Sequence, residues 1–130
     1  KMIAAATQKD IYSELHEIEL TDYLAGALSA ERKFDIVTAA DVFIYVGKLD
    51  DLFATTAKRL QTGALYVFSV ENSNSADFVL RNSGRYAQSR AYIEKLADTN
   101  GFSIEVAEPA KIRKHGNEFM PGTIYILKYA

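Results

Sequence analysis

Two apolar stretches separated by a helical pattern constrain this chain more than any other feature. Residues 34–46 and 63–71 are rich in β-branched and aromatic side chains, and each stretch contains few polar residues. Such runs are typical of strands that are covered on both faces in a parallel sheet. The segment between them repeats apolar residues at helical spacing, namely Leu49, Leu52, Phe53, Ala57 and Leu60. The order strand, helix, strand predicts an α/β fold.

An acidic residue lies where the chain leaves each of these strands. Asp41 directly follows Asp35 to Ala40, the strand in the first stretch, and Glu71 ends the second. In open α/β sheets, ligands bind in the crevice beyond the carboxyl ends of the strands. Both acidic residues are therefore expected at a functional site.

Composition limits the chain to one domain and excludes several classes of site. With 130 residues, 48% of them hydrophobic, the chain can bury one core, so residues 1–130 are expected to form a single domain. The net charge of -2 and the absence of long Lys or Arg runs argue against nucleic acid. There is no cysteine, which excludes disulfides, thiolate zinc sites and a cysteine nucleophile. No apolar run approaches the roughly 20 residues of a membrane span, and no signal peptide is visible, so we expect a soluble, cytoplasmic protein.

The remaining elements follow from local patterns. Helices are expected at residues 1–8, 23–28 and 89–100, with Thr21 or Asp22 capping the second and Ser89 the third. The helix between the two apolar strands is expected to carry Lys58 and Arg59 in its last turn, which complements the helix dipole.

Turn and strand signals complete the pattern. Thr62-Gly63 and Asn100-Gly101 are expected to end the two longer helices. Residues 15–18 could form a short strand, and residues 71–84 read as a loop with one turn of helix at residues 78–80. The last two β-rich segments, residues 102–106 and 122–129, are separated by an exposed connection at residues 111–118.

Taken together, these motifs resemble the middle of a class I S-adenosylmethionine-dependent methyltransferase. The resemblance is carried by residues 34–43, the amphipathic helix, residues 60–65 and the strand that ends in Glu71. Residues 84–89, the helix ending at Asn100-Gly101-Phe102 and the final strand pair extend it over nearly the whole chain. It is most similar to bacterial small-molecule methyltransferase domains, some of which are joined to helical repeats. The resemblance implies a partial Rossmann-like sheet, mostly parallel with an antiparallel C-terminal strand and helices on both faces.

The resemblance also implies a cofactor site for S-adenosylmethionine. Glu19 and Leu20 match the end of the family's third strand, where an acidic side chain accepts a hydrogen bond from the adenine amino group. Asp41, Val42 and Phe43 match the turn that lines the methionine part of the cofactor. The alternatives are a solvated charge at a helix start for Glu19 and a plain turn at the strand end.

Four further residues match the family's substrate pocket: Tyr45, Arg85, Tyr86 and Gln88. Tyr45 could equally serve packing, because the chain contains eight tyrosines. Many relatives carry histidine where Gln88 stands, so this chain lacks that general base and its catalytic residue stays unidentified. Methyl transfer by in-line displacement depends mainly on orientation and needs few catalytic side chains.

Two features of the family are missing from this chain. Its glycines are isolated, so there is no glycine-rich turn after a first strand, and no acidic residue after a second strand. Residues 1–6 resemble the helix that follows that second strand. We therefore expect a fragment of a methyltransferase for a small-molecule acceptor, unable to bind the cofactor fully as it stands.

Other functions remain open or are disfavoured. The main alternative is a non-catalytic structural or interaction module built on a Rossmann-like sheet. A nucleotide-dependent oxidoreductase is weaker because there is no dinucleotide fingerprint. His16 and His115 lack ligand partners at a clear spacing, so no metal site is expected, and no serine lies in a G-x-S-x-G motif.

The missing strands would leave one strand edge bare. In the family's sheet order, the strand at Asp35 to Ala40 pairs on one side with the absent first strand. An apolar, uncharged edge invites pairing with another copy. We expect a homo-oligomer through this edge, by direct contact or by exchange of residues 1–28, or else pairing of residues 15–18 with the edge.

Overall fold

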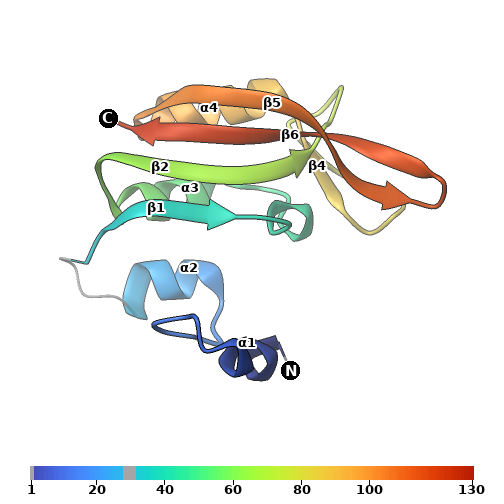
Figure 1. The fold of residues 1–130 in the computed structure, drawn as a ribbon. Coiled ribbons are helices and arrows are strands. Elements are labelled where there is room, and N and C mark those ends of the chain that lie inside the picture. The colour runs from blue at the N-terminus through green and yellow to red at the C-terminus, as the bar shows by residue number, and fades with distance from the viewer. Residues whose placement is uncertain (1, 28–31) are drawn as a thin grey trace.

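The computed structural model describes residues 2–27 and 32–130, which form a four-stranded sheet, a separate hairpin and several helices (Figure 1). The helical segments are α1 (Met2–Lys9), α2 (Leu20–Asp22), the π-helix η1 (Tyr23–Ala27), the 3₁₀ turn η2 (Phe43–Tyr45), α3 (Asp50–Ala57) and α4 (Arg90–Asn100). The strands are β1 (Phe34–Ala39), β2 (Leu60–Glu71), β3 (Phe78–Leu80), β4 (Tyr86–Gln88), β5 (Phe102–His115) and β6 (Glu118–Tyr129).

The main sheet has the order β1-β2-β6-β5. Strand β1 pairs in parallel with β2, and β6 is antiparallel to both β2 and β5. Strands β1, β2 and β5 thus run in one direction, and only β6 opposes them. The predicted α/β class, a mostly parallel sheet with an antiparallel C-terminal strand, is confirmed.

One face of the sheet is covered by helices α3 and α4, which lie behind it in Figure 1. Aromatic side chains fill the space between them: Phe43, Phe53, Tyr66, Phe68, Phe102 and Tyr125 are all buried. The register places Tyr125 of β6 opposite Phe68 of β2, and their rings stack with centroids 5.3 Å apart. Such pairs add to the free energy that burial alone supplies.

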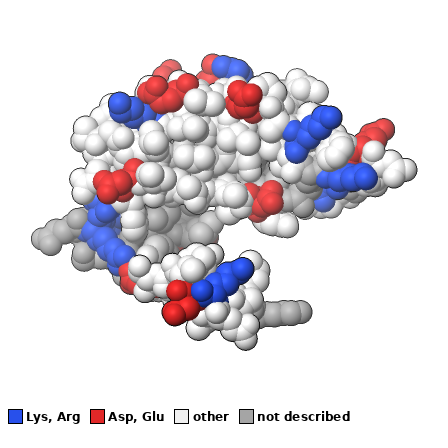
Figure 2. All heavy atoms as spheres, viewed as in Figure 1, with Lys and Arg blue, Asp and Glu red and all other residues white. Residues whose placement is uncertain are grey.

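The opposite face of the sheet, here called the front face, carries no helix within the described chain (Figure 1). Its side chains alternate with those of the core and include Ile36, Thr38, Leu65, Val67, Ile124 and Ile126. Figure 2 shows the middle of this face free of charged side chains, with Lys, Arg, Asp and Glu around the rim. Helices were expected on both faces of the sheet, but in the described chain helices cover one face only.

The helix between β1 and β2 ends earlier than predicted. Asp50 and Asp51 occupy the first turn of α3, but the helix stops at Ala57, with Lys58 as C-cap. Leu60, expected in the helix, begins β2, and Arg59 lies between the two elements. Gly63 does not stop the helix: it has a φ of 83° inside β2, where the pairing with β1 shifts register between Phe34 and Ile36. The bulge uses the glycine's freedom at positive φ.

Residues 78–80 form a strand rather than the predicted turn of helix. Strand β3 pairs antiparallel with β4, with Val79 opposite Ala87. The apolar run Phe78-Val79-Leu80 finds a strand partner across the turn at residues 81–85, so tertiary pairing replaces local helix formation. The predicted loop is therefore shorter, at residues 72–77.

The C-terminal strands are longer than predicted. The connection expected at residues 111–118 belongs mostly to β5 and β6, which pair as far as His115 and Glu118. The turn contains only Gly116 and Asn117, and Gly116 has a φ of 64°. A two-residue glycine turn matches the twist of a hairpin, so the charged segment pairs rather than looping out.

Helix α4 agrees with its sequence signals. The Ser89 hydroxyl oxygen accepts a hydrogen bond from the amide of Tyr92 at 3.1 Å, and Gly101 caps the other end at a φ of 82°. Tyr92, Ile93, Leu96 and Ala97 form its buried face.

The N-terminal region departs from prediction in two respects. Residues 15–18 form no strand and do not pair with β1, whose one strand neighbour among the described residues is β2. The segment is largely exposed, and two of its four residues, His16 and Glu17, are polar, so pairing with β1 would bury little apolar area. The cap of α2 is Glu19, not Thr21 or Asp22. Lys1 and Leu28, the predicted limits of two helices, lie outside the described residues.

Candidate functional site

The turn after β1 is strained at Asp41. This residue has a φ of 54°, in the left-handed region that non-glycine residues rarely occupy. Its amide lies 3.5 Å from the hydroxyl oxygen of Ser69 on the neighbouring strand. The turn continues into η2, where the amides of Tyr45 and Val46 donate to the carbonyls of Val42 and Phe43 at 3.1 Å each. Strain held in place by surrounding contacts is typical of functional turns.

The side chain of Gln88 holds this turn through hydrogen bonds. Its Nε2 lies 3.0 Å from the carbonyl oxygen of Phe43, 2.8 Å from that of Val46 and 3.3 Å from that of Gly47. The side chain is only 1% exposed. Because an amide nitrogen carries two hydrogens, it shares them among three acceptors and joins the turn to β4.

Two hollows flank β1 near this turn. The first, of about 290 Å³, lies between α2, η1 and the core side of β1, and its walls include Leu20, Leu24, Val42 and Phe43. The second, of about 470 Å³, lies on the front face, and its walls include Asp41, Ser69, Lys111 and Ile112. Strand β1 separates them, since Thr38 contributes to both.

The predicted cofactor residues divide between these two hollows. Leu20, Val42 and Phe43 line the first and Asp41 the second. Glu19 lines neither, because its carboxylate accepts hydrogen bonds from the hydroxyl of Thr21 and the amide of Asp22 at the start of α2. The Thr21 hydroxyl, followed by the Asp22 amide, lowers the pKa of Glu19 below its ordinary value. The described residues thus do not enclose a cofactor between them.

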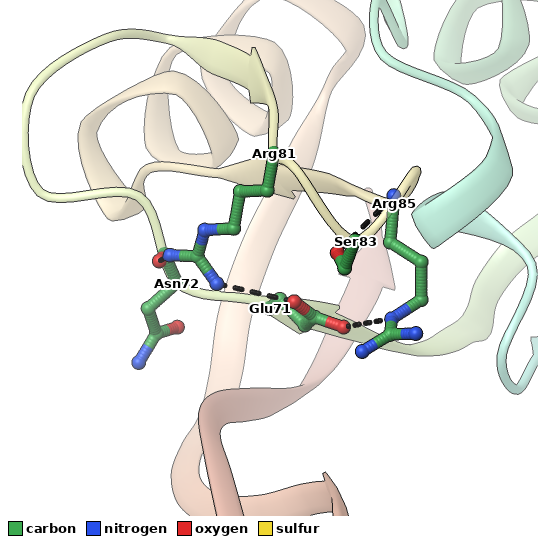
Figure 3. Close-up of polar contacts among 5 residues, drawn as sticks. All are labelled: Glu71, Asn72, Arg81, Ser83 and Arg85. Atoms are coloured by element: carbon green, nitrogen blue, oxygen red, sulfur yellow. Dashed lines mark hydrogen bonds and ion pairs between the residues drawn. The ribbon is translucent and has the colours of Figure 1, made fainter. Parts of the chain in front are cut away.

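A buried ion-pair cluster lies at the carboxyl end of β2. Glu71 is 0% exposed, and each of its carboxylate oxygens meets one arginine (Figure 3). Nη1 of Arg81 lies 3.1 Å from Oε1, and Nε of Arg85 lies 2.9 Å from Oε2. Arg81 also donates through Nη2 to the carbonyl oxygen of Asn72. We call Glu71, Arg81 and Arg85 the arginine cluster.

A tight turn explains why two arginines reach one carboxylate. Arg81 directly follows β3, and Arg85 directly precedes β4. The amide of Arg81 donates a hydrogen bond to the carbonyl oxygen of Arg85 at 2.9 Å. Between them, Gly84 donates to the Arg81 carbonyl at 2.9 Å and has a φ of 82°. A three-residue loop that ends in a left-handed glycine is a common hairpin connection. The turn therefore sets both guanidinium groups on the same side, facing the end of β2.

Two buried polar atoms have no hydrogen-bond partner among the described residues. They are Nη2 of Arg85 and Oε1 of Gln88. A buried polar atom without a partner costs free energy, and the cost is larger for a charged group. Two of the predicted substrate residues therefore carry unused hydrogen-bonding capacity.

The other two predicted substrate residues are aromatic and lie apart from the cluster's ion pairs. Tyr45 is 68% exposed on η2. Tyr86 packs against Phe78, with ring centroids 6.4 Å apart, and against Gly47, where an added Cβ would lie 2.6 Å from the Tyr86 ring. Tyr86 thus joins β4 to the segment after η2.

Sequence reasoning did not identify Arg81 or assign a partner to Glu71. The available signal was Asn82-Ser83-Gly84 between two short β-rich segments, a typical hairpin turn flanked by two arginines. Recognising that hairpin would have placed both arginines next to each other.

The described residues contain no group of three or more His, Asp or Glu side chains placed to hold a metal ion. Among the helices they form, none combines the length and the apolar character that crossing a bilayer requires.

Comparison with known proteins supports the fold assignment. No protein-family model matches the sequence, and no curated protein sequence matches it. Solved structures do match. An S-adenosylmethionine-dependent methyltransferase from Clostridium acetobutylicum is 15% identical over 97% of this chain, with a TM-score of 0.64. The magnesium protoporphyrin IX methyltransferase from Synechocystis PCC 6803, with S-adenosylmethionine bound, is 18% identical over 99% of this chain, with a TM-score of 0.67.

A third similar structure carries a different activity in its name. The cyclase SpnF is 12% identical over 97% of this chain, with a TM-score of 0.71. This chain spans 68% of the Clostridium structure, 55% of the Synechocystis structure and 60% of SpnF, so all three are longer. At these identities the likeness establishes the fold and not the reaction.

Proposed function

From the class I methyltransferase fold, we propose that this chain is the C-terminal part of an S-adenosylmethionine-dependent methyltransferase domain that acts on a small molecule. The observation that carries the proposal is the strained turn at Asp41, at the carboxyl end of β1, held by Gln88. This is the end of an open α/β sheet at which ligands bind. The similar Synechocystis structure contains S-adenosylmethionine, which supports the same cofactor here.

The described residues supply one wall of the cofactor site. The hollow beside Val42 and Phe43 has about 290 Å³, just below the roughly 300–1,000 Å³ of typical ligand pockets. Asp41 faces the other hollow, and Glu19 is engaged at its helix start. We therefore propose that a segment preceding this chain in sequence completes the site. The bound cofactor would supply the electrophilic methyl group, and the protein would contribute orientation.

Calorimetric titration with S-adenosylmethionine and S-adenosylhomocysteine tests this proposal. We expect no measurable heat from the 130-residue chain and clear binding by a longer chain that extends upstream of Lys1. Tight binding by the short chain would contradict the claim that its site is incomplete. Absence of binding by both chains would contradict the methyltransferase assignment itself.

The uncovered front face favours a second candidate, a non-catalytic interaction module. This face presents partly exposed apolar side chains from β1, β2 and β6, including Ile36 and Ile124 at 60% and 39% exposure. Exposed apolar patches mark interaction sites in many proteins. If the longer chain covers this face and binds the cofactor, the interaction module is excluded.

A further inference from the structure

The arginine cluster carries more positive than negative charge. It contains two guanidinium groups and one carboxylate, all at least partly buried, with Arg85 only 16% exposed and Arg81 27% exposed. In a buried setting, charges are normally matched, because an unmatched charge loses its hydration without compensation. The cluster therefore has capacity for one more anionic group.

Arg85 is the member that retains this capacity. Its bond to Glu71 uses Nε, and its Nη2 is buried without a partner among the described residues. The terminal nitrogens of a guanidinium group form a planar fork that matches the two oxygens of a carboxylate or phosphate. By contrast, Arg81 uses both Nη1 and Nη2, on Glu71 and on the carbonyl of Asn72.

The cluster's position agrees with a ligand-binding role. Glu71 is the last residue of β2, so the cluster lies at the carboxyl end of the parallel strands, where Figure 3 shows both arginines converging on it. The turn that contains Asp41 leaves the same end of the neighbouring strand β1. Substrates of open α/β sheets bind at this end.

We infer that Arg85 binds an oxyanion, a carboxylate or a phosphate, and that the methyl acceptor of this domain is therefore an acidic small molecule. The role of Glu71 is to orient the guanidinium group through Nε and to leave its fork for the ligand. The identification of the ligand as the methyl acceptor rests on the proposed function. The anion site itself does not, because it is formed entirely by this chain.

Nitrogen-15 NMR of the arginine Nε–H groups tests the inference on the 130-residue chain without cofactor. The probes are malonate and inorganic phosphate at constant ionic strength, with sodium chloride and neutral malonamide as controls. We expect a saturable shift of the Arg85 signal with malonate, phosphate or both, and none with either control. Saturation by only one oxyanion would identify which of the two classes the site accepts.

Arg85→Lys is the variant that separates anion binding from folding. A lysine can still pair with Glu71 but has no second nitrogen for a fork, so we expect the oxyanion affinity to fall at least about tenfold. Ligand-induced shifts in backbone amides near residue 85 measure the variant's affinity. Arg90→Lys is the matched control, because the side chain of Arg90 is 64% exposed. In the described chain its one ion pair is with Glu94, one helical turn away. Arg90→Lys should leave the affinity unchanged.

Two results would overturn the inference. One is a wild-type Arg85 signal that shifts no more with the oxyanions than with chloride. In that case water accepts the remaining hydrogen bonds of the guanidinium group. The other is unchanged oxyanion affinity in Arg85→Lys. Failure of the proposed function looks different, since the chain would bind malonate or phosphate while the longer chain gave no heat with S-adenosylmethionine.

Discussion

At the scale of single residues, the Nε2 end of Gln88 lies where only a hydrogen-bond donor is satisfied. Its Nε2 faces three carbonyl oxygens, from Phe43, Val46 and Gly47. The resemblance predicts Gln88 as a substrate contact because it matches a segment that covers the family's substrate pocket. In the structure its nitrogen binds the turn that contains Asp41, Val42 and Phe43, three of the predicted cofactor residues, so we propose that Gln88 positions this turn.

Gln88→Glu tests this role by replacing the donor with an acceptor of nearly the same shape. At pH 7 the introduced carboxylate would face three carbonyl oxygens, and we expect the free energy of unfolding to fall by about 2–4 kcal/mol. Below pH 5 the carboxyl is protonated and donates one hydrogen bond, so the loss should shrink. Urea unfolding at both pH values measures this, with exposed Gln61→Glu as control. Equal losses at both pH values would contradict the donor role.

At the scale of elements, Tyr92 joins helix α4 to the start of α3. Its hydroxyl oxygen accepts a hydrogen bond from the amide of Leu49 at 2.7 Å, and its hydroxyl donates to the carboxylate of Asp50. The amide of Leu49 lies where a helix N-terminus leaves donors unsatisfied. The contact thus fixes α3, and with it the segment that follows η2.

The buried hydroxyl of Tyr92 also leads us to expect that the protein loses stability at alkaline pH. Burial, followed by the hydrogen bond to Asp50, raises the pKa of Tyr92 from 10.0 to about 12. Because the folded state holds this proton more tightly, its contribution to stability is complete below about pH 10 and is lost as the pH rises to about 12. Burial raises the pKa of Tyr66 and Tyr125 in the same direction.

We expect Tyr92→Phe to lower the free energy of unfolding by about 1–2 kcal/mol at pH 7 and to flatten its decline between pH 10 and 12. Urea unfolding across this pH range measures both effects. Tyr45→Phe, at a 68% exposed position, should change neither. An unaltered alkaline slope in Tyr92→Phe would show that the other tyrosines account for it.

Gly122 lies in strand β6 of the β5–β6 hairpin, at a position with no room for a side chain. An added Cβ would lie 1.9 Å from Cγ1 of Ile112 and 2.4 Å from the backbone oxygen of Val70. Because backbone cannot move as easily as a side chain, Gly122→Ala should cost about 1–3 kcal/mol of unfolding free energy. Gly26→Ala is the control, since its Cβ would meet nothing within 4 Å. Equal thermal stability of the two variants would contradict this packing.

At the scale of the whole molecule, the two edges of the sheet differ. Strand β5 carries Pro109 and a series of charged residues, which discourage pairing with another chain. Strand β1 carries a single charge, Asp35, and its outer edge has no strand partner in the described chain. The edge at Asp35 to Ala40 is therefore the one that we propose for self-association.

Ile36→Lys tests this proposal, because a charge repeated across a pair of edges opposes their association. We expect the wild-type chain to associate in multi-angle light scattering and Ile36→Lys to shift it to monomer. Ile124→Lys places the same charge on the same face but on β6, an interior strand. If Ile124→Lys dissociates the chain equally, the front face and not the edge holds the copies together.

The sequence alone determined the elements whose signals are local or periodic. The apolar run of β1, the buried face of α4 and the Ser89 and Gly101 caps all depend on neighbours within a few residues, and each was predicted. The mostly parallel sheet followed from the order of these elements, because a strand, helix, strand sequence allows few connections.

Only the tertiary structure decided which distant groups meet. Phe78–Leu80 became a strand because β4 pairs with it, and the charged segment near residue 111 became part of β5 because β6 lies alongside. Glu71 at the end of β2 was visible in sequence, but its two arginines reach it only through the turn at Gly84. Such contacts arise from pairing between segments, which no local propensity encodes.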